Sequence, residues 1–293
     1  MQAQVIVLGT ATPGGGFPLY GGAFAEAVNA ADASLVVETR NTKGSTENVP
    51  LLQSGTLDIA LVQGEVANPA LAEDGSGLRI VAAMYPSPGM FVTRGDSPCR
   101  SIAGLKGQAV AFGAKGSGLT ILGRTVIDGL GLDADRDFNA VYLDKAGDGP
   151  LMVADGRVAA LWGAGIGWPG FTAVASSAAG ARFLVPDAPE IARILAKHPF
   201  LKPLTIAAGS YPGQGSAIDS VGSWSYVLSR PGFDAQLAYR LARALHGAEA
   251  ALAAKLEQAR ETTAANTMKA APRADLIHTG VLRYLAEIGI TRG

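Results

Sequence analysis

The chain alternates short apolar segments with helical segments, and glycine-rich turns join them. The first example is Gln4–Leu8, which leads through the glycines of 9–16 into an alanine-rich helix near Gly21–Ala31. Strands that alternate with helices are typical of a largely parallel sheet, because two parallel strands need a long crossover between them. The pattern therefore predicts the α/β fold class.

The same periodicity predicts the remaining elements in two successive blocks and a C-terminal section. In the first block the predicted strands are Ser34–Glu38, Asp58–Val62, Leu78–Tyr85 and Met90–Arg94, and a helix lies around Thr46–Ser54. In the second block they are Ala109–Phe112, Asn139–Tyr142, Val158–Trp162 and Arg182–Val185, with helices near Ser117–Leu130 and Pro150–Asp155. The C-terminal section has strand Val221–Ser229 and helices Phe233–Gly247, Glu249–Thr262 and Thr279–Glu287.

Two α/β blocks followed by helices predict two lobes. We expect the chain to cross to the second lobe near Phe91–Arg94 and to return near Ala217–Trp224. Lobe 1 would then contain residues 1–92 and 218–293, and lobe 2 residues 93–217. A cleft between two lobes is a common place for a small ligand to bind.

Charge and hydropathy exclude several classes of protein. The 24 basic and 25 acidic residues are scattered and give a net charge of −1, which argues against a nucleic-acid surface or a polybasic membrane patch. Apolar runs fall far short of the roughly 20 residues that span a bilayer. The start, Met1–Gln4, lacks the basic and apolar regions of a signal peptide, which fits a cytosolic protein or a secreted one without its signal. The single cysteine, Cys99, predicts neither an intramolecular disulfide nor a metal cluster.

Three strand-to-helix loops are candidate ligand sites, because glycine lets the backbone approach a ligand and a helix N-terminus attracts anions. The first, residues 9–16, adds the hydroxyls of Thr10 and Thr12, and it lacks the glycine spacing of a dinucleotide fingerprint. A plain tight turn is the alternative. In the second, Gly44–Asn48, Ser45 is also well placed to cap the following helix.

The third loop, Gly113–Gly118, resembles a phosphate loop only superficially, because Lys115 precedes its second glycine. Gln63 follows another strand, and Trp162–Pro169 contains two tryptophans that could line a pocket or belong to the core. Because open α/β sheets bind ligands at the carboxyl ends of their strands, we expect these loops to face one cleft.

No catalytic centre is evident from the sequence. None of the three histidines, His198, His246 and His278, lies in a zinc motif, and no G-x-S-x-G elbow surrounds Ser117. His246 is expected to be solvated after a helix, and His278 to cap one. We therefore predict no enzyme, no cofactor and no metal site.

Several strings resemble one family of transport receptors. They are Gly9-Thr10 with Gly21, Gly44-Ser45-x-Glu47-Asn48, Leu52-x-x-Gly55-x-x-Asp58, Gln63, Leu105-x-Gly107, Gly113-x-x-Gly116-Ser117-Gly118, Gly209-Ser210-Tyr211-x-Gly213-Gln214 and His278-x-Gly280-x-x-Arg283-Tyr284. In this collinear order, over nearly the whole chain, the sequence resembles the TAXI family of solute receptors, which serve tripartite ATP-independent periplasmic (TRAP) transporters.

The resemblance implies a type II periplasmic binding protein fold, with two α/β lobes closing on a ligand cleft. It also implies a periplasmic receptor that delivers an organic acid or amino acid to a membrane permease. The ligand contacts carried over are Thr10, Gly15, Gly16, Phe17, Ser45, Asn48, Gln63, Gly116, Ser117, Gly118 and Leu119, with Trp162, Gly165 and Trp168 as weaker choices.

One departure and two alternatives remain. The family usually has two tyrosines and a proline after the first glycine loop, where this chain has Phe17-Pro18-Leu19-Tyr20, so a tyrosine hydroxyl is missing at Phe17.

The alternatives are an enzyme on the same two-lobe scaffold, which would act on a small anionic substrate through Lys115, and the sensing part of a regulator. The absence of a poised histidine or a carboxylate pair argues against the enzyme, and that of a DNA-binding helix pair against the regulator.

Overall fold

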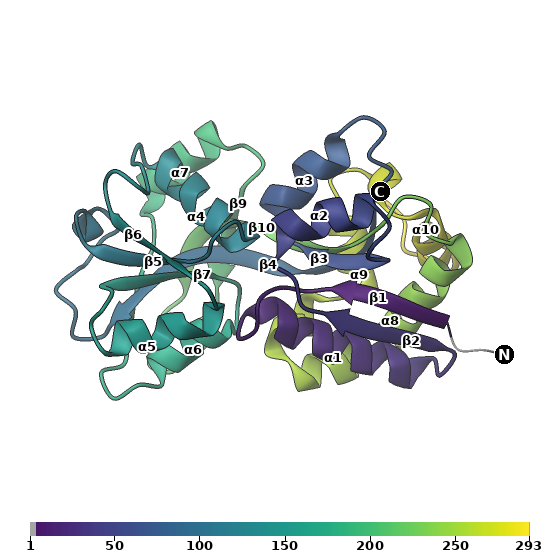
Figure 1. Ribbon diagram of the computed structural model, residues 1–293, viewed down its shortest axis with the longest axis horizontal. Coiled ribbons are helices and arrows are strands. Elements are labelled where there is room, and N and C mark those ends of the chain that lie inside the picture. The colour runs from purple at the N-terminus through teal and green to yellow at the C-terminus, as the bar shows by residue number, and fades with distance from the viewer. Residues whose placement is uncertain (1–3, 293) are drawn as a thin grey trace. The chain divides into compact units, whose positions relative to one another are not determined.

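The computed structural model describes residues 4–292, which form two compact units (Figure 1). Of these residues, unit 1 contains residues 4–11, Phe17–Tyr85 and residues 224–292, and unit 2 contains Thr12–Gly16 and Pro86–Ser223. The expected boundaries were 92/93 and 217/218. Packing changes instead at 85/86 and 223/224, inside two long strands that belong to both units, β4 (Arg79–Arg94) and β10 (Ile218–Ser229).

Unit 1 is a mixed sheet with helices. Its strands β1 (Gln4–Gly9), β2 (Leu35–Arg40) and β3 (Ile59–Val62) join β10 and β4 in the order β2-β1-β3-β10-β4. β1 runs parallel to β2 and β3, whereas β10 is antiparallel to β3. The helices are α1 (Gly16–Ala31), α2 (Ser45–Gln53), α3 (Gly64–Ala72), α8 (Ala235–Lys255), α9 (Ala264–Ala270) and α10 (Thr279–Glu287), with a 3-10 turn, η3 (Glu257–Glu261).

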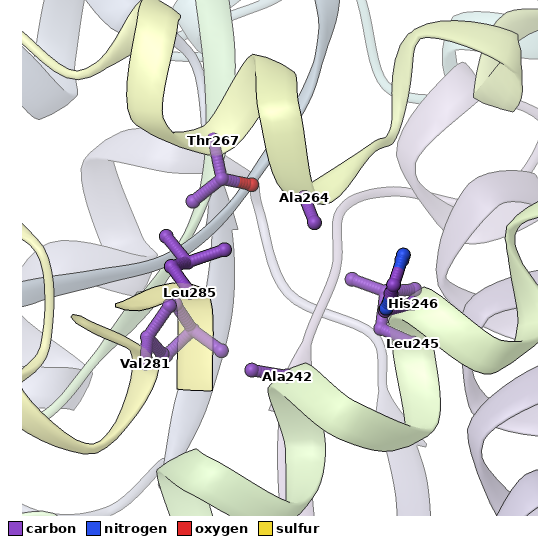
Figure 2. A pocket seen from close by; sticks show the side chains of 8 residues that line it. Ala242, Leu245, His246, Ala264, Thr267, Val281 and Leu285 are labelled. Carbon is purple, nitrogen blue, oxygen red and sulfur yellow. The ribbon is translucent and has the colours of Figure 1, made fainter. Parts of the chain in front are cut away.

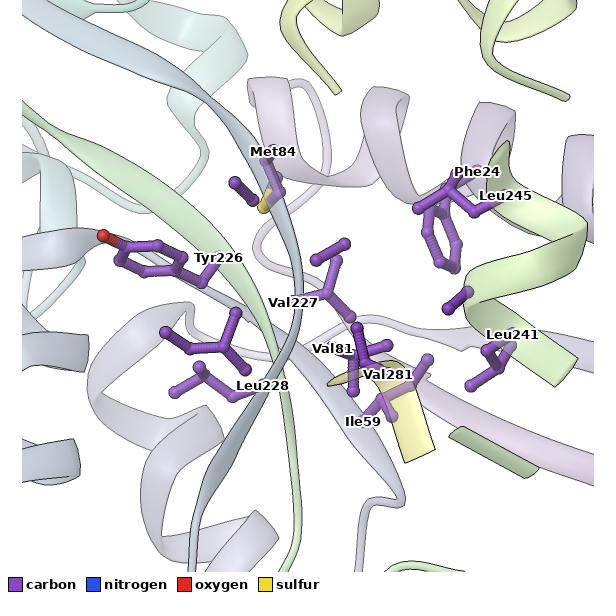
Figure 3. Close-up of a cluster of buried hydrophobic side chains, with 14 of the residues drawn as sticks. Phe24, Ile59, Val81, Met84, Tyr226, Val227, Leu228, Leu241, Leu245 and Val281 are labelled. Carbon is purple, nitrogen blue, oxygen red and sulfur yellow. The ribbon is translucent and has the colours of Figure 1, made fainter. Parts of the chain in front are cut away.

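The core of unit 1 lies between this sheet and its helices. All four residues of β3 are buried, as expected of a strand that is covered on both faces. Figure 3 shows Ile59 of β3, Val81 of β4 and Val227 of β10 in one apolar interior with Phe24 of α1 and Leu241 of α8.

Unit 2 repeats the strand-turn-helix pattern. Strands β5 (Ala109–Ala114), β6 (Asn139–Leu143) and β7 (Ala160–Ala164) follow β4 in the order β4-β7-β5-β6, with β5 parallel to both of its neighbours. Two further strands are β8 (Ala181–Leu184), which pairs with β4, and β9 (Lys202–Ile206), which pairs with β10. The helices are α4 (Gly118–Gly129), α5 (Gly149–Ala154), α6 (Pro169–Ala175) and α7 (Ala188–Lys197).

Successive residues of β7 enter different cores of unit 2. Ala160 and Trp162 belong to one apolar cluster, and Leu161 between them belongs to the other. This is the period-two alternation of a strand that has a core on each face.

Two predictions of secondary structure were wrong because each divided one continuous element into two. The two strands predicted at 78–85 and 90–94 are one continuous 16-residue strand, β4, although Pro86 and Pro88 lie inside it. The two helices predicted at 233–247 and 249–262 are one 21-residue helix, α8, that runs through Gly247. Helices α3, α6, α7 and α9 and strand β9 were not predicted, whereas α10 has its predicted bounds.

Within residues 4–292, no helix is both long and apolar enough to cross a bilayer, and no group of three or more metal-ligating side chains is found.

Candidate functional site

Thr10 follows β1 and joins the ends of two strands. Its side chain is fully buried, and Oγ1 donates to the Arg40 carbonyl at 3.2 Å and to Asn41 Oδ1 at 3.3 Å. Its carbonyl accepts from Thr42 Oγ1 at 3.1 Å. The predicted ligand hydroxyl is therefore bonded to the protein itself.

Asn48 links the same region to β3. Its Nδ2 donates to the carbonyls of Thr10 at 2.8 Å and Leu61 at 2.9 Å, and the side chain is fully buried. Because both partners are carbonyls, Oδ1 must point the other way, and it has no hydrogen-bond partner. It lies over Gly9, where an added Cβ would be 3.0 Å from it. Asn48 thus closes the ends of β1 and β3 against each other.

Ser45 does not cap α2, contrary to one of the two sequence interpretations. The N-cap is Gly44, whose φ of +106° favours glycine, and it makes no side-chain cap hydrogen bond. Ser45 is the first helical residue, and its Oγ accepts from the backbone N–H of Gln63 at 3.0 Å. Glu47 supports the helix start by accepting from the Lys43 N–H at 2.5 Å. The loops after β2 and β3 are therefore bonded to each other.

Gln63 is the N-cap of α3 and carries a donor without a partner. The residue is 5% exposed, and its Nε2 is buried without a hydrogen-bond partner. The buried carboxyl of Glu65 lies in the first turn of the same helix, where the helix dipole favours a negative charge. Burial, with a smaller contribution from the charge of Glu65, raises the pKa of Tyr226 well above its usual range.

The first glycine loop leads into α1. Gly15 and Gly16 are buried, and Phe17 is half-buried against the core of unit 1. Tyr20 is fully buried and pairs with Thr262, their hydroxyl oxygens lying 3.1 Å apart. The tyrosine hydroxyl missing at Phe17 is therefore not replaced by Tyr20.

The start of α4 in unit 2 provides backbone donors. Ser117 is the N-cap, and its Oγ accepts from the Thr120 N–H at 3.2 Å, so this hydroxyl is occupied by capping. The N–H groups of Gly118 and Leu119, in the first turn, precede the first intrahelical hydrogen bond. They lie just beyond the carboxyl end of β5, where the side chain of Lys115 is exposed.

Trp162 lies in a core of unit 2. It is fully buried, its Nε1 donates to the Leu119 carbonyl at 2.8 Å, and its ring centroid is 4.7 Å from that of Phe91. An added Cβ at Gly89 would lie 2.4 Å from its ring, and one at Gly123 2.9 Å, so both glycines are needed for its packing.

Trp168 and Gly165 are held by a tyrosine that sequence reasoning did not select as a site residue. Trp168 is 5% exposed and packs edge-on against Phe171 at 4.9 Å. The Tyr211 hydroxyl donates to the Gly165 carbonyl at 2.7 Å and accepts from the Trp168 N–H at 3.4 Å. Gly165 has φ +98°, which explains the glycine there. The string Gly209-Ser210-Tyr211 was the available signal.

The histidines have structural partners. His278 caps α10, as predicted: it accepts from the Gly280 N–H at 3.2 Å, which leaves Nε2 to donate to the Phe233 carbonyl at 3.0 Å. Burial lowers the pKa of His278 and so favours this neutral form. His246 was expected to be solvated after a helix, but it lies inside α8, half-buried, with Nδ1 2.7 Å from the Tyr284 hydroxyl.

The family model for the NMT1-like family matches residues 8–289, almost the whole chain. The chain belongs to the NMT1-like family.

Solved structures show which fold this NMT1-like chain has. It is similar to the alkanesulfonate-binding protein SsuA of Xanthomonas axonopodis pv. citri at 17% identity, over 98% of this chain and 84% of that one, with a TM-score of 0.53. A TctC solute-binding protein from Polaromonas is 16% identical over 86% and 87%, with a TM-score of 0.51. A protein from Bordetella bronchiseptica RB50 is 13% identical over 97% and 98%, with a TM-score of 0.61. The predicted two-lobed α/β fold of periplasmic binding proteins is confirmed.

Two cavities of this NMT1-like chain lie apart from the predicted contacts. In unit 1, a space of about 10 Å³ between α8, α9 and α10 is lined by apolar side chains with His246 and Thr267 (Figure 2), and it has room only for a water. In unit 2, an open groove of about 440 Å³ is lined by Arg94, Cys99 and Arg157, among others. It includes Ala109, at the amino end of β5, whereas the predicted contacts follow the carboxyl end of that strand.

Proposed function

We propose that this NMT1-like protein is a solute-binding receptor for uptake and that it holds a small organic acid or amino acid without chemistry. Family membership and the fold support this, and so do the solutes in the names of structural relatives. These relatives include an alkanesulfonate-binding protein and the substrate-binding protein of an amino acid ABC transporter. Both solute classes carry an acidic group.

The observation that carries the proposal is the chemistry at the carboxyl ends of the parallel strands. In unit 2, β5 is followed by the backbone N–H groups of Gly118 and Leu119, which have no partner within the helix because they lie in the first turn of α4. The positive end of the α4 dipole lies behind them. In unit 1, β3 is followed by Gln63, whose buried amide nitrogen has no partner. Backbone and amide donors suit a small anion, which they hold by hydrogen bonds and dipoles.

The roles of the predicted contacts follow from their hydrogen bonds. Gly15, Gly16 and Gly116 would let backbone approach the solute, and Phe17, Leu119 and Gln63 would contact it with side chains. Thr10, Ser45, Asn48 and Ser117 would shape the loops, because their hydroxyl or amide donors are already bonded. Trp162, Gly165 and Trp168 would support the unit 2 loops from behind.

The finer assignment is a TRAP-type receptor of the TAXI group, located in the periplasm and working with a membrane permease. It is supported by the strings shared with that group, including Gly116-Ser117-Gly118 and the terminal His278-x-Gly280. If it is right, solute uptake by reconstituted receptor and permease stops when an ionophore removes the ion gradient, and it continues without ATP.

A thermal-shift screen of amino acids and small carboxylates tests the receptor function, together with mass spectrometry of any solute that copurifies. A solute at a hundredfold excess over its dissociation constant should stabilise the fold by about 2.7 kcal/mol. In the variant Leu119→Glu, a carboxylate in the first turn of α4 suits the helix dipole but repels an anionic solute, so the shift should be lost while the apo protein stays folded.

Phe200→Glu is the matched control. Phe200 is 39% exposed and packs against His198, whose ring bonds Asp128 near the C-terminal end of α4. A glutamate at position 200 therefore adds the same charge as Leu119→Glu, but at the opposite end of that helix. The shift should survive in this variant. Equal shifts in both variants would refute the α4 site, and the absence of any bound or copurified solute would refute the receptor.

A further inference from the structure

Gln258 is a buried carboxamide to which the protein supplies no partner. It lies in the 3-10 turn η3 of unit 1 and is 2% exposed, and neither Nε2 nor Oε1 has a hydrogen-bond partner. A buried amide that makes no hydrogen bond costs stability, and an apolar side chain of similar size would avoid that cost. A residue with this property points to a polar group that binds it from outside the chain.

Within unit 1, the end of the turn that carries Gln258 is linked by hydrogen bonds to β4 and to α1. It leads directly to Thr262, whose hydroxyl donates to the Met84 carbonyl at 2.7 Å and pairs with the Tyr20 hydroxyl at 3.1 Å. The ring of Tyr85 contacts that of Tyr20 edge-on at 5.4 Å. Tyr20 lies near the start of α1, so the residue that ends η3, Thr262, is bonded to the helix that follows the first glycine loop.

We propose that Gln258 is a solute-binding residue and that its carboxamide pairs with an uncharged group that both donates and accepts hydrogen bonds, a carboxamide above all. The inference rests on the proposed receptor function and specifies the class of solute. Gln258 can donate through Nε2 and accept through Oε1, which is the complement of a second amide. A solute carboxylate would lie against the acceptor Oε1 with no positive charge to balance it. Burying a carboxylate without such a counter-charge is unfavourable.

Matched pairs of probes test this: L-glutamine with L-glutamate, and succinamic acid with succinic acid. Both members of each pair carry one carboxylate, and the second group is exchanged between amide and acid. We expect the amide member to raise the melting temperature of the wild type more than its acid partner. In Gln258→Leu, the affinity for the amide probe should fall about tenfold, and the preference for the amide over the acid should disappear. The melting temperature of the apo protein should be unchanged or higher.

Gln236→Leu is the control, because Gln236 is an exposed glutamine of unit 1 that bonds Arg283 at 2.7 Å, and it should keep the preference. A lower apo melting temperature in Gln258→Leu, with the preference intact, would overturn the inference, since the amide would then be bonded within the fold. If only acid probes bind, or if a copurified solute lacks such a group, the solute class is wrong and the receptor function stands. If no probe and no copurified solute binds, both proposals fail.

Discussion

Asn48 offers the sharpest test of how the strand ends of unit 1 are held together. In Asn48→Ala, the carbonyls of Thr10 and Leu61 lose donors at 2.8 and 2.9 Å in a site without solvent access. Each lost bond should cost about 1 kcal/mol or more, and the small cavity about 1 kcal/mol in addition. The total is about 3 kcal/mol of the free energy of unfolding.

Asn48→Asp keeps the shape but turns the donor into an acceptor. The new carboxyl would face two carbonyl oxygens, so burial and repulsion raise its folded pKa above the unfolded value of about 3.9. Below that value the acid is neutral in both states and can still donate one bond. Above it, the loss of stability relative to wild type should grow by about 1.4 kcal/mol per pH unit until the folded pKa is reached.

Urea unfolding followed by circular dichroism at pH 4.5 and pH 7 measures both effects. The control is Asn139→Ala, because Asn139 makes the same type of bond to the Gly107 carbonyl, at 3.0 Å, but is exposed. Its cost should be about 0.5 kcal/mol. A cost for Asn48→Ala no larger than the control, or a penalty for Asn48→Asp that does not grow with pH, would refute this account.

Three further predictions concern the rest of the chain. Gly123→Ala should destabilise unit 2 by about 1–3 kcal/mol and shift tryptophan fluorescence, because the new Cβ would lie 2.9 Å from Trp162; an unchanged spectrum would contradict this. Hydrogen bonds from Arg240 and Ser34 lower the pKa of Asp32 to about 2, so this carboxylate should contribute about 2 kcal/mol of stability above pH 4 and lose it as the pH falls towards 2; a pH-independent difference between Asp32→Asn and wild type would refute it. Gly247→Ala, in α8 with no atom within 4 Å of the added Cβ, should stabilise the protein by about 0.5–1 kcal/mol in the same urea assay, and any loss of stability would contradict the open position.

The sequence predicted the fold class and most elements because local periodicity is encoded residue by residue. The apolar run of β3 and the helical pattern of α10 needed no tertiary information. Boundaries failed where packing overruled a local signal. The predicted strands left a gap at 86–89, where Pro86 and Pro88 lie, and a predicted helix ended at Gly247, yet β4 and α8 continue through these residues.

The roles of polar side chains were less predictable than their positions. Ser45 looked like a helix cap, but its partner is the N–H of Gln63, which lies 18 residues further along the chain. Tyr20 bonds Thr262, which is 242 residues away. Such partners are set by which loops pack together, and no local pattern encodes that.

By itself, the sequence determined an α/β chain whose strands end in glycine-bearing turns with few charges, because propensity and periodicity act over a few residues. Only the tertiary structure decided which of the polar groups there are already bonded. It placed Trp162 in a core, bonded Thr10 and Asn48 to backbone, and left Gln63 and Gln258 buried with unbonded amide atoms. Hydrogen-bond saturation depends on distant segments meeting in space, so it can be read only from the folded chain.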